Sequence, residues 1–341
     1  MRNTADETAR RLNWLRRLAE RMRRATLAGL RAEPDARLAQ TTGVRGGDLI
    51  YRLDEHAEVE LLAGCAEWSA EESFLLIAEG LEGGQRVFPA DAPAGTWAFT
   101  LIVDPVDGTR GLMYGKRSAW ALFGIAPAPR ADFWPTLADI TIALQAELPT
   151  PRAALADTLW AVAGAGAQGE TLDLRDGSLT LFTPRPSEAA NLAGGFASFA
   201  KFFPGVKAQT AQIEEAFFQV VMGPPPATAA QVFDDQYISS GGQLCEIMTG
   251  RDRFIADIRP LFAARGLSAS LCAHPYDLCT ALIARQAGAI VTDPWGEDLR
   301  APLDTETPVA WVAYANARLR DALAPTLARV LRGAGLDAPQ P

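Results

Sequence analysis

The chain contains few residues of the types on which zinc sites and disulfide frameworks depend. Among its 341 residues are four cysteines and two histidines, and no two cysteines form a Cys-x-x-Cys pair. Structural zinc sites need four closely spaced ligands of these types, and disulfide frameworks belong to small, cysteine-rich secreted chains. We therefore expect neither feature, and we expect reduced, buried thiols in a cytoplasmic protein.

Long apolar segments are also missing. No stretch of 18 or more consecutive apolar residues occurs, so the sequence predicts no transmembrane helix. The N-terminus lacks the apolar core of a signal peptide, and the acids Asp6, Glu7 and Glu20 argue against a transit peptide. These features favour a cytoplasmic location and no membrane partner.

An excess of positive charge is absent as well. The formal net charge of −9 disfavours binding to nucleic acid or to an anionic membrane by general electrostatics. The exception is the segment 5–31, where apolar residues recur at helical spacing and arginines cover much of the remaining surface. Within an acidic chain, this pattern indicates an exposed structural helix or a subunit contact.

What is present is the composition of a globular protein, 48% hydrophobic and 21% charged. A chain of this length forms one large domain or two of ordinary size. Composition changes at Pro184-Arg185-Pro186, so we place the boundary there. The predicted parts are an N-terminal half, residues 1–186, and a C-terminal half, residues 187–336.

One stretch combines a buried strand with charged residues. The β-forming run 99–103 is followed by Asp104-Pro105-Val106-Asp107-Gly108-Thr109, and Pro105 is expected to end the strand because it has no N–H. Two carboxylates so close favour a hard cation such as Mg²⁺ between them, and Thr109 is expected to cap a helix. A surface turn with two solvated acids explains the local pattern equally well.

The string DPVDGT resembles the DP-(I/L/V)-DGT signature of the inositol monophosphatase family. This family lies within the Mg²⁺-dependent, lithium-sensitive phosphomonoesterases, which also include fructose-1,6-bisphosphatase and 3′(2′),5′-bisphosphate nucleotidase. Two upstream segments extend the resemblance. Asp48 and Asp54 match the acids of a D-x-x-T-x-x-D segment, and Glu79 matches the first acid of a G-E-E segment that follows a strand. Read alone, Asp54 is more simply a helix N-cap and Glu79 a solvated strand end.

The C-terminal part carries the longest match. Residues 276–299 resemble W-D-x-x-A-x-x-x-I-x-x-E-A-G-G-x-V-T-D-x-x-G-x-x-L, with Tyr276 in place of Trp and Gln286 in place of Glu. By itself, Asp277 reads as another helix N-cap. The resemblance identifies it with the family's last metal ligand.

The resemblance implies a fold, a cofactor and a mechanism. The fold would be a layered α/β/α/β/α sandwich, with a largely antiparallel sheet in the first half and a mixed sheet in the second. Asp54 and Thr109 would orient the attacking water, and the amides of Gly108 and Thr109 would hold the phosphate. A homodimer and lithium inhibition are also expected. Two or three Mg²⁺ would be held by Glu79, Asp104, the Val106 carbonyl, Asp107 and Asp277.

The substrate is less well defined. Ser239 matches an S-x-G element that lines the family's substrate pocket, and Ser270 falls where the family has an inositol-contacting acid, beside an apparent insertion at 260–271. His274 is a third candidate for substrate binding, although a packed position is the simpler interpretation. We expect a small-molecule phosphate ester, either a sugar or polyol phosphate or a 3′(2′)-phosphonucleotide. A non-catalytic metal- or phosphate-binding relative is the other alternative.

Overall fold

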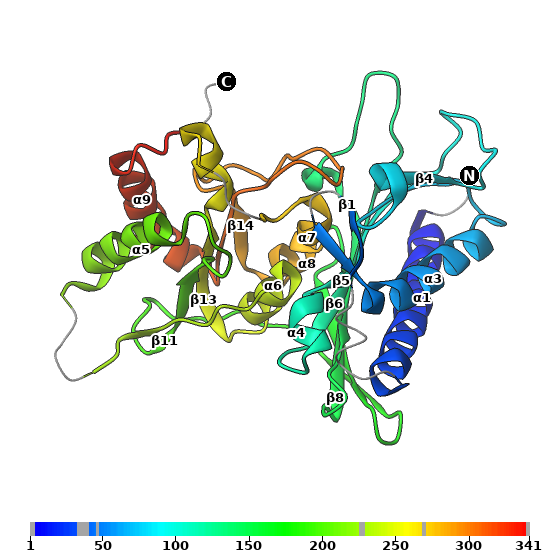
Figure 1. Cartoon of the computed structure of the whole chain (residues 1–341), viewed down its shortest axis with the longest axis horizontal. Coiled ribbons are helices and arrows are strands. Elements are labelled where there is room, and N and C mark those ends of the chain that lie inside the picture. The colour runs from blue at the N-terminus through cyan, green and yellow to red at the C-terminus, as the bar shows by residue number, and fades with distance from the viewer. Residues whose placement is uncertain (1–3, 33–40, 46–47, 225–228, 268–270, 339–341) are drawn as a thin grey trace.

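The computed structural model describes residues 4–32, 41–45, 48–224, 229–267 and 271–338. Five layers of helix and sheet are stacked across the molecule (Figure 1), in agreement with the α/β/α/β/α sandwich that the sequence predicts. An outer helix pair covers an eight-stranded sheet, three helices separate this sheet from a five-stranded one, and a second helix pair covers the far side. In layer order the helices are α1 (Thr4–Ala32) and α3 (Arg52–Trp68), then α6 (Ser240–Met248), α7 (Pro275–Leu278) and α8 (Ala281–Ala287), then α5 (Lys207–Met222) and α9 (Ala317–Gly333).

The large sheet lies wholly in the first half of the chain. Its strand order is β10-β9-β8-β7-β6-β5-β3-β4, and only the β3–β5 pair is parallel. Strands β3 and β6, which pair with β5 on either side, are continuous apolar runs, as expected for a sheet covered on both faces. Its strands are β3 (Phe74–Ala78), β4 (Gln85–Phe88), β5 (Phe99–Asp107), β6 (Ala119–Pro127), β7 (Ile142–Leu148), β8 (Leu155–Val162), β9 (Ala167–Asp173) and β10 (Leu179–Phe182).

The prediction that Pro105 ends its strand is wrong. Strand β5 continues to Asp107, and its pairing with β6 shifts register between Asp104 and Asp107. Such a bulge accommodates a residue without an N–H, because the ladder is interrupted at that point anyway. The strand therefore carries both acids, and the bulge changes the direction in which their side chains point.

The arginine-rich helix is a structural layer. Leu15, Leu18 and Met22 of α1 are at most 2% exposed, and Trp14 stacks on Trp68 of α3 with ring centroids 3.8 Å apart. The amphipathic pattern of 5–31 thus predicts the helix and its buried face. Several of its arginines form ion pairs with glutamates of neighbouring elements, namely Glu60, Glu67, Glu72 and Glu170.

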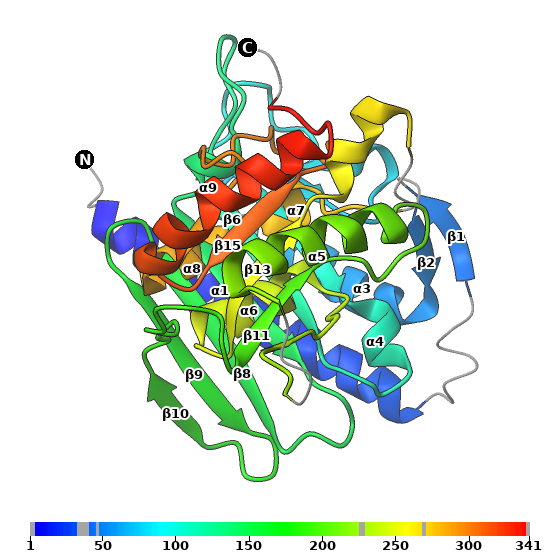
Figure 2. The same cartoon turned by 90° about the vertical axis from the view of Figure 1, so that its left-hand side faces the viewer.

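The smaller sheet is mixed, again as predicted. Its order is β12-β11-β13-β15-β14, with parallel pairs β11–β12 and β11–β13 and antiparallel pairs β13–β15 and β14–β15. Helices α5 and α9 lie side by side over one face (Figure 2). Its strands are β11 (Gly195–Phe199), β12 (Val232–Phe233), β13 (Asp252–Asp257), β14 (Ile290–Thr292) and β15 (Trp311–Tyr314).

Shorter elements connect these layers. The two sheets fall on either side of the proposed boundary at residue 186, because the large sheet ends at Phe182 and the small sheet begins at Gly195. None of the helices in the described residues is long and apolar enough to cross a membrane.

The short elements are β1 (Thr41–Arg45), β2 (Asp48–Tyr51), α4 (Thr109–Met113) and the 3-10 turns η1 (Glu82–Gly84), η2 (Leu137–Asp139) and η3 (Arg259–Arg265).

A buried acid lies where β13 begins. Asp252 is 8% exposed, and its burial raises the pKa of the carboxyl to about 7. The negative charges of Glu246 and Asp235 also raise this pKa, whereas Arg117 and Arg251 lower it. In the folded protein near neutral pH, the Asp252 carboxyl is therefore only partly ionised.

We expect Asp252→Asn to stabilise the protein above pH 7 and to leave its stability unchanged near pH 4. Between the ordinary pKa of 3.8 and the folded-state value of about 7, the folded protein holds a proton that the unfolded chain has released. The free energy of unfolding therefore falls as the pH rises through this window, by up to about 4 kcal/mol from this group. Urea unfolding at pH 4, 6 and 8 measures the difference, and an equal pH dependence in both proteins would contradict it.

Candidate active site

The bulge in β5 holds two acids inside the protein. Asp104 is 1% exposed and Asp107 is 6% exposed. The Val106 N–H donates a hydrogen bond of 2.9 Å to Oδ1 of Asp104, which fixes that carboxylate against its own strand. Gly108 follows with a φ of 98°, a conformation that favours glycine, and the chain turns there into α4.

Asp107 is held by the second half of the chain. Its Oδ2 accepts hydrogen bonds from Oγ of Ser239, at 2.8 Å, and from the N–H of Gly241, at 2.6 Å. A Cβ on Gly241 would lie 2.5 Å from a Leu122 methyl carbon and 3.0 Å from this same oxygen, so only glycine fits. The beginning of α6 is thus built around the Asp107 carboxylate.

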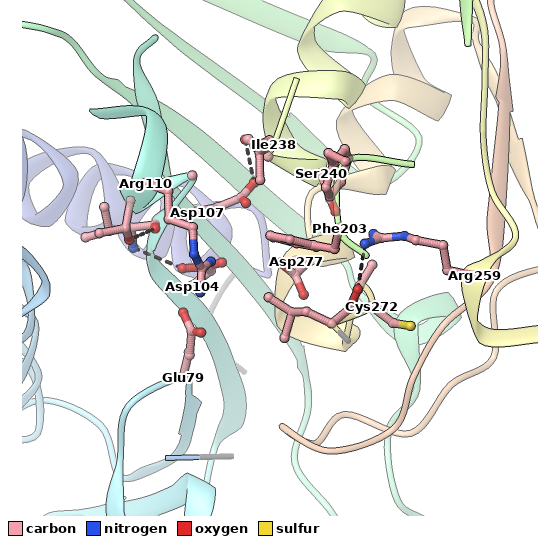
Figure 3. A pocket seen from close by; sticks show the side chains of 17 residues that line it. Glu79, Asp104, Asp107, Arg110, Phe203, Ile238, Ser240, Arg259, Cys272 and Asp277 are labelled. Atoms are coloured by element: carbon pink, nitrogen blue, oxygen red, sulfur yellow. Dashed lines mark hydrogen bonds between the residues drawn. The ribbon is translucent and has the colours of Figure 1, made fainter. Parts of the chain in front are cut away.

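Asp277, on helix α7 of the middle layer, lies beside Asp104 and Asp107. Carboxylate oxygens of Asp104, Asp107 and Asp277 lie within 4.8 Å of one another, and Glu79 lines the same pocket (Figure 3). Asp277 is not the helix N-cap that the isolated sequence suggests. His274 is the N-cap of α7, and its N–H donates to Oδ2 of Asp277 at 2.6 Å.

The electrostatics of this cluster are unfavourable without a cation. Burial raises the pKa of Asp104 well above its usual value, and the charges of Glu79, Asp107 and Asp277 raise it further. Burial and the charges of Asp107 and Glu79 have the same effect on the pKa of Asp277. Burial also raises the pKa of Asp107 to about 6, although its hydrogen bonds oppose the shift. Like charges this close, inside a protein, call for a positive partner.

Asp54 and Thr109 form a pair beside the cluster. Oγ1 of Thr109 lies 2.8 Å from Oδ1 of Asp54 and 2.8 Å from the Val106 carbonyl oxygen. Neither residue is the N-cap that the sequence suggests. Helix α3 begins at Arg52, so Asp54 lies within its first turn, and the N-cap of α4 is Gly108. The first turns of two helices thereby bring the Asp54 carboxylate into contact with the Thr109 hydroxyl, and Thr109 lines the pocket.

The pocket has about 520 Å³ of empty space, part of it open to solvent. Of the predicted substrate contacts, Ser239 lines it. His274 is not among the described residues that line it, and instead stacks on Tyr276 with ring centroids 5.3 Å apart. Ser270 lies outside the described residues.

The sequence analysis missed the wall formed by the C-terminal half. Phe202 and Phe203, on the loop after β11, line the pocket together with Arg259. Figure 3 shows Phe203 and Arg259 on the same side of the pocket. One edge of this guanidinium donates two hydrogen bonds to Asp257, from Nε to Oδ1 at 2.8 Å and from Nη2 to Oδ2 at 2.5 Å. A signal was present, since Asp257-Ile258-Arg259 ends a strand as an acid and a base two residues apart. The aromatic pair gave no comparable signal, because adjacent phenylalanines are ordinary core residues.

Comparison with solved structures supports the fold strongly. An extragenic suppressor protein suhB from Bartonella henselae matches with a TM-score of 0.61 at 16% identity, covering 93% of this chain and 97% of that one. Leishmania major fructose-1,6-bisphosphatase gives 0.65 at 14%, covering 94% and 93%. An inositol monophosphatase from Anabaena gives 0.58 at 13%, covering 95% and 97%. No protein-family model and no curated protein sequence matches the chain.

The chain therefore has the fold that inositol monophosphatases share with fructose-1,6-bisphosphatase, over nearly its whole length. At such low identity the similarity establishes the fold and not the activity. The chemistry of the pocket is the independent indication of an activity, because a buried cluster of acids consistent with a divalent metal lies between the two sheets.

Proposed function

We propose that this protein is a Mg²⁺-dependent phosphomonoesterase acting on a small phosphorylated metabolite. The observation that carries the proposal is the meeting of Asp104, Asp107 and Asp277 within 4.8 Å, in a pocket that Glu79 also lines. These acids come from both halves of the chain, and solvated turn residues would not be buried together. The fold neighbours named as phosphatases support the same reaction class.

The residues present fit a hard divalent cation. Every charged donor in the cluster is a carboxylate oxygen, no described histidine or cysteine belongs to it, and oxygen-only sites are typical of Mg²⁺. Burial and the neighbouring carboxylates raise the pKa values of Asp104 and Asp277, and a cation between these acids would offset both effects. We propose Glu79, Asp104, the Val106 carbonyl, Asp107 and Asp277 as the ligands.

The chain's own groups would orient the attacking water and hold the phosphate. When bound, Mg²⁺ supplies positive charge that stabilises the phosphate oxygens and activates water. The Thr109 hydroxyl, which lies 2.8 Å from the Asp54 carboxylate, can accept a hydrogen bond from the attacking water while it donates to Asp54. The amides of Gly108 and Thr109 would hold the phosphate at the pocket edge.

Two substrate classes suit this site. Sugar and polyol phosphates match its small size, whereas the Phe202–Phe203 wall favours a 3′(2′)-phosphonucleotide. Homodimer formation, lithium inhibition and a cytoplasmic location stay predictions.

A hydrolysis screen tests the proposed function. The purified protein would be incubated with sugar, polyol and nucleoside phosphates, with Mg²⁺ or with excess EDTA, and released phosphate measured. We expect turnover of at least one ester with Mg²⁺ and none with EDTA. Binding of Mg²⁺ without turnover of any ester would identify a non-catalytic relative, and turnover in EDTA would refute the metal assignment.

A further inference from the structure

A long groove lies between helix α1 and the edge of the large sheet. It has about 1930 Å³ of empty space, part of it open to solvent, and none of the described residues that line it also lines the pocket of the acid cluster. Its helix side runs from Asp6 to Arg24. Figure 2 shows β9 and the edge strand β10 at the lower left. The sheet side consists of Thr158, Glu170, Leu172, Gly177 and Leu179. The groove is therefore a surface feature separate from the site of the proposed reaction.

The floor of the groove is apolar and exposed. Leu172 of β9 and Leu179 of β10 are neighbours in the sheet register, and Leu181 points to the same face as Leu179 because side chains alternate along a strand. Leu179 is 58% exposed and Leu181 is 74% exposed. Helix α1 packs mainly on β7, and α8 packs on β8 and β9 from the other face of the sheet. The outer helix layer therefore stops beside these leucines and leaves them open to solvent.

Positive charge lines the helix side of the groove. Six arginines and three acids line it, in a chain whose net charge is −9. Glu20 accepts hydrogen bonds from Nη1 of Arg23 at 2.8 Å and from Nε of Arg24 at 2.7 Å, so one carboxylate faces two guanidinium groups. Arg17 is exposed and forms no ion pair with any residue that the structure describes. The groove therefore carries surplus positive charge. The lining arginines that are paired with other glutamates are Arg10, Arg16 and Arg21.

The arginines form a row along the helix. Arg10 and Arg24 are 14 positions apart, which corresponds to about 21 Å along the axis of α1. Leu172 and Leu179 lie on the opposite side of the same groove. A ligand that satisfies both sides is therefore elongated, apolar on one face and negatively charged along one flank.

An acidic amphipathic helix has these properties. Lipids carry their charge in a head group at one end, so a lipid would leave most of the row unpaired. Nucleic acid carries charge along its length, but a floor of leucines gives its bases neither hydrogen bonds nor aromatic stacking. A second copy of this chain, related by twofold symmetry, would place two positive grooves face to face. The charge and the apolar floor therefore favour a partner helix over these occupants.

We propose that the groove binds an amphipathic helix of a partner protein. Its apolar residues, spaced at i, i+3, i+4 and i+7, pack on Leu172, Leu179 and Leu181, and its acidic flank pairs with Arg17 and Arg24. The bound helix lies beside α1 and extends the outer helix layer over β9 and β10. This inference does not depend on the proposed phosphatase function, because the groove and the pocket of the acid cluster are lined by different residues.

Synthetic peptides test the inference. The probe is a fluorescein-labelled peptide of about 18 residues, with leucines along one helical face and glutamates on both flanks. The two comparison peptides are an isomer of the same composition without an apolar face and a version with lysine in place of glutamate. Fluorescence anisotropy measures their binding to the full-length protein. We expect the probe to bind at least about tenfold more tightly than either comparison peptide.

Single substitutions locate the binding surface. Arg17→Glu and Leu179→Ala are each expected to weaken binding of the probe about fivefold or more. The matched controls are Arg318→Glu, at an exposed arginine of α9 in the opposite outer layer, and Leu155→Ala, at a leucine that is 51% exposed on the other face of the sheet. Both controls should bind the probe as the wild type does. All four side chains are exposed, so the variants are expected to fold.

Four results would overturn the inference. Equal affinity for the probe and its isomer would show that charge alone attracts the peptide, and equal affinity of the wild type, Arg17→Glu and Leu179→Ala would place the peptide elsewhere. Sedimentation with phosphatidylglycerol vesicles that Leu179→Ala abolishes, in the absence of peptide binding, would assign the groove to a membrane surface. A dimer in analytical ultracentrifugation that Leu179→Ala dissociates would assign the groove to a second copy of the chain.

Discussion

Replacement of Asp104 by asparagine is expected to lower kcat at least about 1,000-fold while the protein stays folded. Asp104 is the most deeply buried acid of the cluster. The negative charges of Glu79, Asp107 and Asp277 raise the pKa of its carboxyl. Asparagine has nearly the same shape but no charge, so it weakens the cation site without opening a cavity. Phosphate release at saturating Mg²⁺ measures the loss.

Thermal unfolding separates this effect from misfolding. Without metal, Asp104→Asn is expected to be at least as stable as the wild type, because it removes a buried charge that its neighbours repel. Mg²⁺ should raise the melting temperature of the wild type more than that of the variant, because a ligand stabilises the state that binds it. Asp252→Asn, the same substitution at a buried acid outside the pocket, serves as control and should retain activity. Near-normal turnover in Asp104→Asn would refute the ligand assignment.

The second large effect is expected from Asp54→Asn. We expect kcat to fall about 100-fold or more, with Mg²⁺ binding nearly unchanged. Oδ1 of Asp54 accepts from the Thr109 hydroxyl at 2.8 Å, and an amide at this position cannot take up a proton. Isothermal titration with Mg²⁺ and steady-state kinetics together distinguish a proton-handling role from a ligand role.

Thr109 offers the matched comparison. Thr109→Ser keeps the hydroxyl that contacts Asp54 and the Val106 carbonyl, whereas Thr109→Ala removes it. Serine should therefore retain most of the turnover, and alanine should lose about as much as Asp54→Asn. Equal losses in the serine and alanine variants would show that the hydroxyl does not orient the water.

Much of the site could be predicted because its residues occur in short, ordered segments. Asp104, Val106 and Asp107 lie within four positions, and strong apolar runs before them predict the strand that carries them. Each of the other acids lies beside a strand or helix whose hydrophobic pattern is clear. The layered architecture followed from the family resemblance and is what the structure shows. Hydrophobic periodicity alone does not predict the order of the strands, because it shows which face of a strand is buried and not which strands lie next to each other in the sheet.

The errors arose where tertiary contacts replace local rules. The missing N–H of Pro105 predicts a strand end, but a bulge lets β5 run on to Asp107. Residue type alone predicts helix caps at Asp54, Thr109 and Asp277, whereas all three lie inside their helices and interact with other elements. The aromatic wall was not foreseen because Phe202 and Phe203 reach the pocket only through the loop after β11.

The acid cluster joins segments that are synthesised far apart in time. Asp107 ends a strand of the large sheet, whereas its neighbour Asp277 and the groups that hydrogen-bond to it, Ser239 and Gly241, come from the second half of the chain. The cluster is therefore complete only after the last fifth of the polypeptide has been made and has packed against the large sheet. Any cation that needs all three acids could bind only from that point on.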